Sequence, residues 1–327
     1  MKFAATFLTD PPSDVLVSRA KEVEAAGFDY VFLNEAQTLF MDPWPVFAQM
    51  AAATDRISIG PCVTNPTLRD PVVTAALLAT LDEMSHGRMV CGIGRGDAAP
   101  RTLGRKPATV RQFDDAIRII RDLVVSGSTV IDGHDVTMRW NPGWALEMWG
   151  AGYGPRTLGV VAARCDGVIV QGAALDLLEL TNRFSEVSTT DPVPQGSPAV
   201  MVAAPAHVGS VDAGHAQLRW FVPSVANHIA ALAASYDGPL PLGLTSILED
   251  RTEYDYQAKG RKDNRGADYV TADMTKTFTF VGSAADHIAK IGDLADRGVD
   301  VVNLYLHHDD VTATIAAYGD VIIPACR

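Results

Sequence analysis

The chain is poor in cysteine and in positive charge. Its 327 residues include only Cys62, Cys91, Cys165 and Cys326, which are widely scattered and form no CxxC pair. This spacing argues against a zinc site or a redox pair and fits reduced thiols in a cytoplasmic protein. Lysine and arginine number 27 against 39 aspartate and glutamate residues, so the formal net charge is −12. General nucleic-acid binding needs an excess of basic residues and is therefore not expected.

Long apolar runs are also missing. No stretch reaches the roughly 18 uncharged apolar residues that a membrane-spanning helix needs. The first ten residues, MKFAATFLTD, hold one lysine and a strand-like run, without the apolar core or cleavage site of a signal peptide. No HExxH, GxSxG or P-loop motif occurs, and no cluster of metal ligands is present. We therefore expect a cytoplasmic protein with neither a membrane contact nor a metal site.

What the sequence does contain is a regular alternation of short apolar runs and longer helical patterns. The runs are FAATFL from Phe3, DYVFLN from Asp29, ISIGPCV from Ile57, MVCGIG from Met89, LEMWGA from Leu146, GVIVQG from Gly167, AVMVAAPAHV from Ala199 and VVNLYL from Val301. They are apolar throughout, which is typical of strands covered on both faces. Eight such units with right-handed crossovers predict a (β/α)8 TIM barrel that occupies residues 1–327 as one domain.

The segments between the runs have helical periodicity. After Ala285, apolar residues recur on one face, and Ser283 with Asp286 three positions later resembles a capping box. The stretch from about Val110 repeats this pattern. Each predicted strand is therefore followed by an amphipathic helix that can cover the sheet.

Two segments interrupt the alternation. In TVIDGHDVTMRW, at about residues 129–140, an Asp-Gly pair between two β-prone runs predicts a hairpin inserted before the fifth strand. Residues 221–278 lack a clear strand and hold helical patches and the charged tract YDYQAKGRKDNRGADY. An insertion of this length between the last two strands predicts a lid or entrance wall.

Four residues are candidates for catalysis, because the active site of such a barrel lies at the C-terminal ends of its strands. Glu35 ends the second predicted strand, His307 and His308 follow the eighth, and His228 in the insertion can reach the same space. They would supply a proton or orient a substrate. Each has a structural alternative: Glu35 can pair with a nearby arginine, and a lone histidine is more often structural than catalytic. Since His307 and His308 are adjacent on a strand, at most one faces the site.

A glycine-rich segment, GAGYGPRTLG, follows the fifth strand. Its Gly154 and Pro155 open a predicted helix whose free N–H groups and dipole suit a phosphate, although a tight turn without a ligand is the alternative. The cofactor contacts expected here and at the end of the sixth strand are Ala151, Gly152, Tyr153, Gly154, Pro155 and Gln171. The earlier GIGRGD segment reads GxGxG after the fourth strand, so it does not predict a dinucleotide site.

Basic residues gather after the fourth strand. They are Arg95, Arg101, Arg105, Lys106 and Arg111. In a chain of net charge −12 this cluster reverses the sign of the charge locally. A positively charged entrance to the active site would attract an anionic cofactor. We take Arg95, Arg101 and Arg105 as cofactor-binding candidates, with a solvated helix flank as the alternative.

Nearly the whole chain resembles the luciferase-like superfamily. The most specific stretch, TDRISIGPCVTNPTLRDPVVTAALLATLDEMSHGRMVCGIGRGD at residues 54–97, is similar to the deazaflavin-dependent methylene-tetrahydromethanopterin reductases. RTLGRKPATV, WGAGYGPRTLG and VDVVNLYLHHDD resemble a subgroup described as coenzyme F420-dependent oxidoreductases. The resemblance implies the same barrel fold.

The resemblance also assigns positions in the third and fourth strands. It implies a non-prolyl cis peptide behind the middle flavin ring at Cys62–Val63. Thr64 and Asn65 would touch the ring or its ribityl chain, and Asp97 matches an acidic residue near the cofactor in relatives. The loop from Gly152 to Pro155 matches the phosphate-binding loop. Many deazaflavin-using relatives end the second strand with Asp-His, whereas this chain has Asn34-Glu35, of which Asn34 is the expected cofactor contact.

The resulting expectation is an oxidoreductase that transfers a hydride between coenzyme F420 and a small C=N, C=C or C=O substrate, heterocycles included. One alternative is an FMN-dependent monooxygenase or flavin reductase on the same fold. Another is a flavin-binding barrel without catalysis. Relatives commonly dimerise through early outer helices, so a homodimer is expected by analogy.

Overall fold

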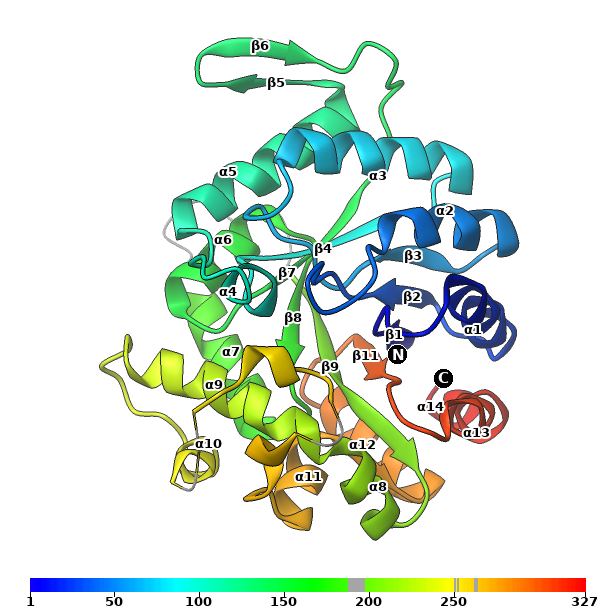
Figure 1. Cartoon of the computed structure of the whole chain (residues 1–327), viewed down its shortest axis with the longest axis vertical. Coiled ribbons are helices and arrows are strands. Elements are labelled where there is room, and N and C mark those ends of the chain that lie inside the picture. The colour runs from blue at the N-terminus through cyan, green and yellow to red at the C-terminus, as the bar shows by residue number, and fades with distance from the viewer. Residues whose placement is uncertain (188–197, 250, 252, 262–263) are drawn as a thin grey trace.

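The computed structural model describes residues 1–187, 198–249, 251, 253–261 and 264–327. Eight parallel strands follow one another around a barrel in chain order (Figure 1). They are β1 (Lys2–Phe7), β2 (Tyr30–Leu33), β3 (Ser58–Pro61), β4 (Val90–Gly94), β7 (Glu147–Ala151), β8 (Gly167–Gln171), β9 (Ala199–Val208) and β11 (Val301–Tyr305). Parallel bridges Ile59–Met89 and Thr64–Ile93 join β3 to β4. The predicted (β/α)8 barrel is confirmed.

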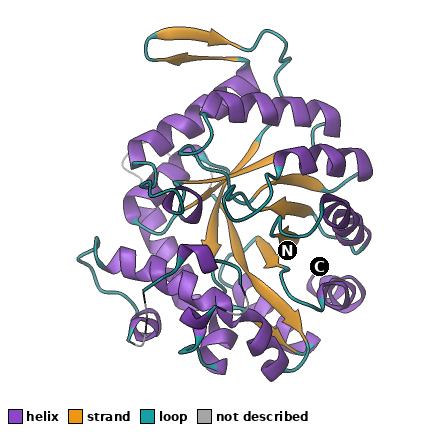
Figure 2. Cartoon of the chain, viewed as in Figure 1, coloured by secondary structure: helices purple, strands orange, loops and turns teal. Residues whose placement is uncertain are grey.

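Helices surround the strands (Figure 2). They are α1 (Ser13–Ala25), α2 (Trp44–Ala53), α3 (Pro71–Ser85), α4 (Ala98–Arg101), α5 (Val110–Arg121), α6 (Pro155–Arg164), α7 (Leu175–Val187), α8 (Val211–Leu218), α12 (Ala284–Ala295), α13 (Val311–Ala317) and α14 (Ile323–Cys326). The π-helical turns η1 (Asp122–Ser126) and η6 (Tyr318–Ile322) extend α5 and α13. The predicted capping box of Ser283 and Asp286 begins α12, and a second one, Thr109 with Gln112, begins α5.

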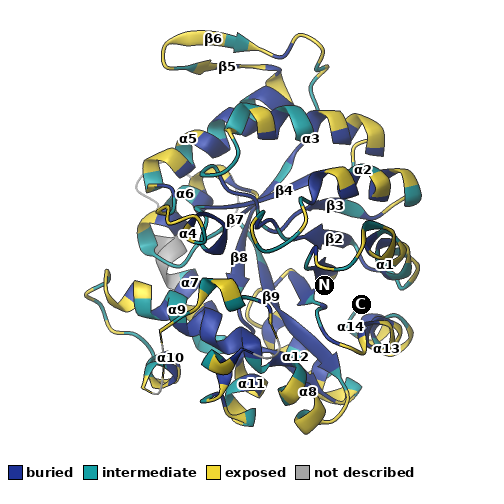
Figure 3. Cartoon of the chain, in the orientation of Figure 1, coloured by how far each residue is buried: buried dark blue, intermediate teal, exposed yellow. Residues whose placement is uncertain are grey.

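The uniformly apolar strands are explained by burial on both faces (Figure 3). In β2, Val31 and Leu33 join the large core that includes helix residues. Tyr30 and Phe32 join a second cluster composed largely of strand residues, which fills the inside of the barrel. Their rings stack with centroids 5.7 Å apart. A strand with a core on each side has no solvent-facing position, so its sequence does not alternate.

The predicted hairpin segment forms β5 (Ser128–Ile131) and β6 (His134–Thr137), which stand clear of the barrel in Figure 1. The turn residues Asp132 and Gly133 have φ of 48° and 80°. Positive φ at both central positions is the reason that Asp-Gly is favoured in such tight hairpins.

The insertion between β9 and β11 is largely helical. It contains η2 (Arg219–Phe221), α9 (Val222–Ala233), α10 (Leu242–Thr245), η3 (Ser246–Leu248), η4 (Tyr256–Ala258), η5 (Arg265–Ala267) and α11 (Ala272–Phe278). It ends in β10 (Phe280–Gly282), which pairs with the last residues of β9 and was not predicted. Three residues are too few for a strand period to be recognised.

Candidate active site

A cavity of about 800 Å³ lies where the strands end. Its size is within the range of small-molecule and cofactor sites. Side chains from the insertion, among them His228 on α9 and Lys259 after η4, form part of its wall. The expected site residues that line it are Asn34, Glu35, Cys62, Val63, Asn65, Arg95, Asp97, Arg101, Ala151, Gly152, Tyr153, Gly154, Pro155, Gln171, His228 and His307. The structure therefore gathers residues from distant parts of the chain into one site.

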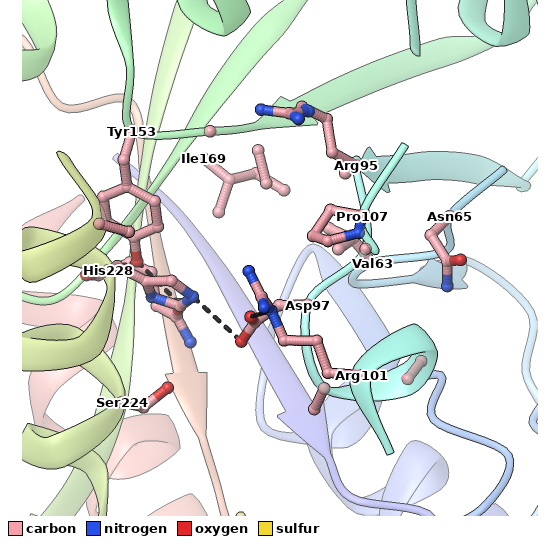
Figure 4. A pocket seen from close by; sticks show the side chains of 18 of the residues that line it. Val63, Asn65, Arg95, Asp97, Arg101, Pro107, Tyr153, Ile169, Ser224 and His228 are labelled. Atoms are coloured by element: carbon pink, nitrogen blue, oxygen red, sulfur yellow. Dashed lines mark hydrogen bonds and ion pairs between the residues drawn. The ribbon is translucent and has the colours of Figure 1, made fainter. Parts of the chain in front are cut away.

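The peptide bond between Cys62 and Val63 is cis, as the resemblance implies. The Val63 side chain lies against β4, where a Cβ added to Gly94 would be 3.2 Å from its Cγ2. At Gly92 an added Cβ would be 2.4 Å from the Pro61 carbonyl oxygen. The glycines of GIGRGD therefore make room for the end of β3. Figure 4 shows Val63 and Ile169 as apolar parts of the cavity wall.

The glycine loop after β7 ends in an open helix N-terminus. Gly154 caps α6, Pro155 is its first residue, and a Cβ added to Gly154 would meet no atom within 4 Å. At Gly152, by contrast, a Cβ would be 2.5 Å from Thr157 Cγ2. The loop can therefore accept an anionic group over the helix, where the dipole favours negative charge.

Four basic side chains line the same cavity as this loop. Arg95, Arg101, Lys106 and Arg156 all line the cavity, and Arg95 Nε donates to the Ala108 carbonyl oxygen at 2.6 Å. Burial lowers the pKa of Arg95, and the nearby charges of Arg156 and Arg101 lower it further. Arg156 lies in the first turn of α6, where the helix dipole disfavours a cation. A bound anion would offset the repulsion among these arginines and the repulsion between Arg156 and the helix dipole.

Asp97 and His228 are joined by a hydrogen bond across the cavity (Figure 4). Asp97 Oδ2 lies 3.2 Å from His228 Nε2, and its Oδ1 accepts from Arg101 Nε at 3.2 Å. Burial raises the pKa of Asp97, but His228, Lys259 and Arg101 outweigh it, so this pKa lies well below its usual value. The His228 ring stacks on Tyr153 with centroids 4.4 Å apart. The pair joins the end of β4 to the insertion.

Glu35 has a different environment from the one expected of a catalytic acid. Its side chain is 1% exposed, and Oε1 accepts from Arg69 Nε at 3.1 Å and from Gln37 Nε2. Arg69 also donates to Asp42 at 2.7 Å and lies over the Trp44 ring. The ion-pair alternative is therefore the one that the geometry favours, since this network connects the loops after β2 and β3.

Three expected site residues do not line the cavity. Thr64 is buried within the wall, where its backbone pairs with β4. Arg105 is exposed beyond α4 because the chain turns away at Gly104. His308 is buried against His207, with ring centroids 5.3 Å apart, and its Nδ1 accepts from the Asp310 N–H. His307 lines the cavity, so the expectation that at most one of the two histidines faces the site is met.

The side-chain oxygens of the two asparagines at the site accept hydrogen bonds from backbone N–H groups of loops. Asn34 Oδ1 accepts from the Thr9 N–H at 2.9 Å, and Asn65 Oδ1 accepts from Thr67 and Leu68 N–H groups at 3.2 Å. Both residues line the cavity and also fix the backbone there. They therefore hold the shape of the wall whatever the ligand.

Several lining residues were missed by the sequence analysis. They are Arg156, Trp220, Phe221, Ser224, Lys259 and Tyr305. Arg156 could have been found, because a cation in a first helical turn calls for an anion nearby. Tyr305 could also have been found, since it shares one face of β11 with Val301 and Asn303. The missed residues of the insertion carried no such signal, because their positions depend on how the insertion folds.

Comparison with known proteins decides the family. A family model described as luciferase-like monooxygenase matches residues 3–301. The chain belongs to the luciferase-like monooxygenase family. It is an oxidoreductase, and its relatives include F420-dependent enzymes.

A 5,10-methylenetetrahydromethanopterin reductase of Archaeoglobus fulgidus is 26% identical over 342 residues, covering 100% of both chains. An F420-dependent glucose-6-phosphate dehydrogenase of Beutenbergia cavernae is 31% identical over 168 residues, covering 45% of this chain and 49% of its own. The structure of the F420-dependent tetrahydromethanopterin reductase of Methanopyrus kandleri matches with a TM-score of 0.77 at 19% identity, covering 100% and 99%. This last likeness concerns the fold.

Within the described residues, no helix is long and apolar enough to cross a membrane. Nor do three or more histidine, cysteine, aspartate or glutamate side chains meet there in a way that could hold a metal ion.

Proposed function

We propose that the protein is an F420-dependent oxidoreductase that transfers a hydride to or from a small C=N, C=C or C=O substrate. One observation carries the proposal: the helix N-terminus at Gly154 shares a cavity with four basic side chains, Arg95, Arg101, Lys106 and Arg156, of which Arg101 pairs with Asp97. The names of the relatives point to the same cofactor. A cofactor with a phosphate and an acidic tail would match both features.

The residues present fit such a cofactor. Gly154 leaves space over α6 for a phosphate, while Val63 and Ile169 offer apolar walls to a flat ring. When bound, F420 supplies the carbon that donates or accepts the hydride, and the protein supplies binding and orientation. The basic residues would hold the acidic tail, and the insertion would keep water from the ring. His228 and His307 are the cavity-lining histidines that could orient a substrate or carry a proton.

FMN remains the alternative cofactor. It has the same phosphate and a ring of the same kind but no acidic tail. FMN would therefore bind at the helix N-terminus, but it has no group for the four basic side chains of the cavity to bind. A homodimer and a cytoplasmic location are also part of the proposal. The outer face of α3 favours the dimer, because Val73 and Met84 are exposed there although both are apolar.

The test compares two double variants. Lys106→Gln with Arg156→Gln removes two lining charges, and Arg111→Gln with Arg105→Gln removes two exposed charges outside the cavity. We expect the first pair to raise the dissociation constant for F420 about tenfold at low salt and to flatten its salt dependence. The second pair should change both by far less. Equal effects of the two pairs would contradict a specific tail site.

A further inference from the structure

The order of the strands gives the cavity two sides of different chemistry. The sheet runs β3-β2-β1-β11-β9-β8-β7-β4, and the bridges between β3 and β4 close it into a barrel. In this order β4 and β7 are neighbours, and β11 and β1 lie across the barrel from them. Residues that follow β4 and β7 therefore line one side of the cavity, and residues that follow β11 and β1 line the opposite side.

The side that follows β4 and β7 is basic. Arg95, Arg101 and Lys106 come after β4, and Arg156 comes after β7 in the first turn of α6. Under the proposed function, this side receives the phosphate and the acidic tail of the cofactor. The opposite side is then the part of the cavity that a second molecule can occupy.

The opposite side is aromatic. Tyr305 and His307 come from the end of β11, Trp220 and Phe221 come from η2 of the insertion, and all four line the cavity. Their rings meet edge to face in a continuous series, with centroid distances of 6.0 Å for His307–Trp220, 5.8 Å for Trp220–Phe221 and 5.9 Å for Phe221–Tyr305. We call these four residues the aromatic wall. Leu8, directly after the neighbouring strand β1, adds an aliphatic side chain to this side of the cavity.

Two members of the aromatic wall have polar atoms that are turned to the protein. The indole nitrogen of Trp220 is buried, and the Tyr305 hydroxyl interacts with the Cys62 thiol. Phe221 has no polar side-chain atom. The aromatic wall therefore meets a ligand mainly through ring carbons.

The other charged side chains of the cavity already have counter-charges. The Glu35 side chain is 1% exposed and pairs with Arg69. The charge of Lys259, on the insertion, is offset by that of Asp97, whose carboxylate it stabilises. These residues therefore offer no free charge to an ionised group of a second ligand.

We propose that the aromatic wall is the substrate subsite and that it selects uncharged compounds with a flat, apolar body next to the reacting bond. This inference rests on the proposed function, because that function assigns the basic side to the cofactor. A flat ring can pack against the edges and faces of the wall. An ionised phosphate or carboxylate group would lose its water there without gaining a partner, so substrates that carry one should bind weakly.

Two aldehydes that differ in charge test the subsite. Methyl para-formylbenzoate is uncharged, and para-formylbenzoate is the matching anion. Each is titrated into protein saturated with F420, so that the basic side is occupied. We expect the uncharged ester to bind about tenfold more tightly than the anion, or more. Equal affinities, tighter binding of the anion, or binding of neither aldehyde would overturn the proposal.

A variant locates the bound ester. Leu8→Lys places a cation on the aromatic side, so it should weaken binding of the ester and strengthen binding of the anion, each by about threefold or more. Leu103→Lys is the matched control, since Leu103 is 45% exposed and lies outside the lining of the cavity. Unchanged affinities in a Leu8→Lys protein that keeps its melting temperature would overturn the assignment of the subsite.

The proposed function and the subsite fail in different ways. Failure of F420 to bind would overturn the proposed function. The ester titrated into the apoprotein would then decide the subsite, because Leu8→Lys should still weaken its binding and Leu103→Lys should not. Equal ester affinities in those two variants would overturn the subsite as well.

Discussion

Glu35 and Gly154 show how much a single residue's surroundings change its interpretation. Both were assigned to the site from their position at strand ends. Glu35 is held by Arg69 and Gln37 with its side chain covered, whereas Gly154 has open space on the side where a Cβ would lie. The first therefore has a structural explanation, and the second has a space that a ligand can fill.

Replacing Glu35 should affect stability. Glu35→Ala leaves the half-buried Arg69 with one partner fewer, so we expect the free energy of unfolding to fall by about 2 kcal/mol. Asp42→Asn, on the more exposed partner of the same arginine, should cost less than about 1 kcal/mol. Urea unfolding of both variants measures the difference. A stable Glu35→Ala protein that has lost turnover would restore the catalytic assignment.

Replacing Gly154 should affect binding. Gly154 has φ of −95°, which any residue adopts, and a Cβ there meets nothing, so Gly154→Leu should fold normally. Its side chain would occupy the space over α6, and we expect F420 and FMN to bind at least tenfold more weakly. Gly292→Leu on α12, where a Cβ also meets nothing, is the matched control. Titration of F420 and of FMN into each variant measures the affinities. Retained binding by Gly154→Leu would exclude this loop as the phosphate site.

Most of the helices and strands of the barrel follow from the sequence. The run from Ala199 to Val208 is one uninterrupted strand, and Asp-Gly marks the hairpin turn, because strand burial and turn chemistry are local properties. The insertion was harder, because its short helices are held by contacts with one another and with α7 and α8, and β10 is held by pairing with β9. The Asp97–His228 hydrogen bond joins residues 131 positions apart, and no local sequence pattern predicts such a contact.

Helix α12 carries a buried histidine that should make stability depend on pH. Burial lowers the pKa of His287 from 6.5 to about 4; Nδ1 bonds with the Tyr318 hydroxyl at 2.9 Å and Nε2 donates to the His207 carbonyl oxygen. Between these values the unfolded chain binds a proton that the folded chain does not, so stability falls as pH falls. We expect His287 to contribute a loss of about 3 kcal/mol from pH 6.5 to pH 4.

The measurement is urea unfolding at pH 6.5, 5.5 and 4.5. His287→Gln should lose less stability than the original chain over this range, because glutamine does not titrate. His134→Gln, in the exposed hairpin, should follow the original chain. Identical pH dependence in all three proteins would show that His287 is not buried as described.

We expect two copies of the whole molecule to dimerise through α3. Val73 and Met84 are 48% and 44% exposed and lie eleven residues apart, which places them on one face of the helix. Val73→Glu with Met84→Glu should shift the mass in solution from dimer to monomer without lowering the melting temperature. Val321→Glu, at an equally exposed valine elsewhere, should remain dimeric. Light scattering after gel filtration measures the mass; a monomeric original chain would contradict the proposal.

We propose that this cavity binds a phosphate-bearing deazaflavin with an acidic tail. The decisive experiment is equilibrium binding of F420 and of FMN to the same apoprotein, at low and at moderate salt. We expect tighter binding of F420 than of FMN, with the F420 affinity weakening more steeply as salt is added. Tighter binding of FMN, with the same salt dependence for both, would contradict it and assign the barrel to flavin chemistry.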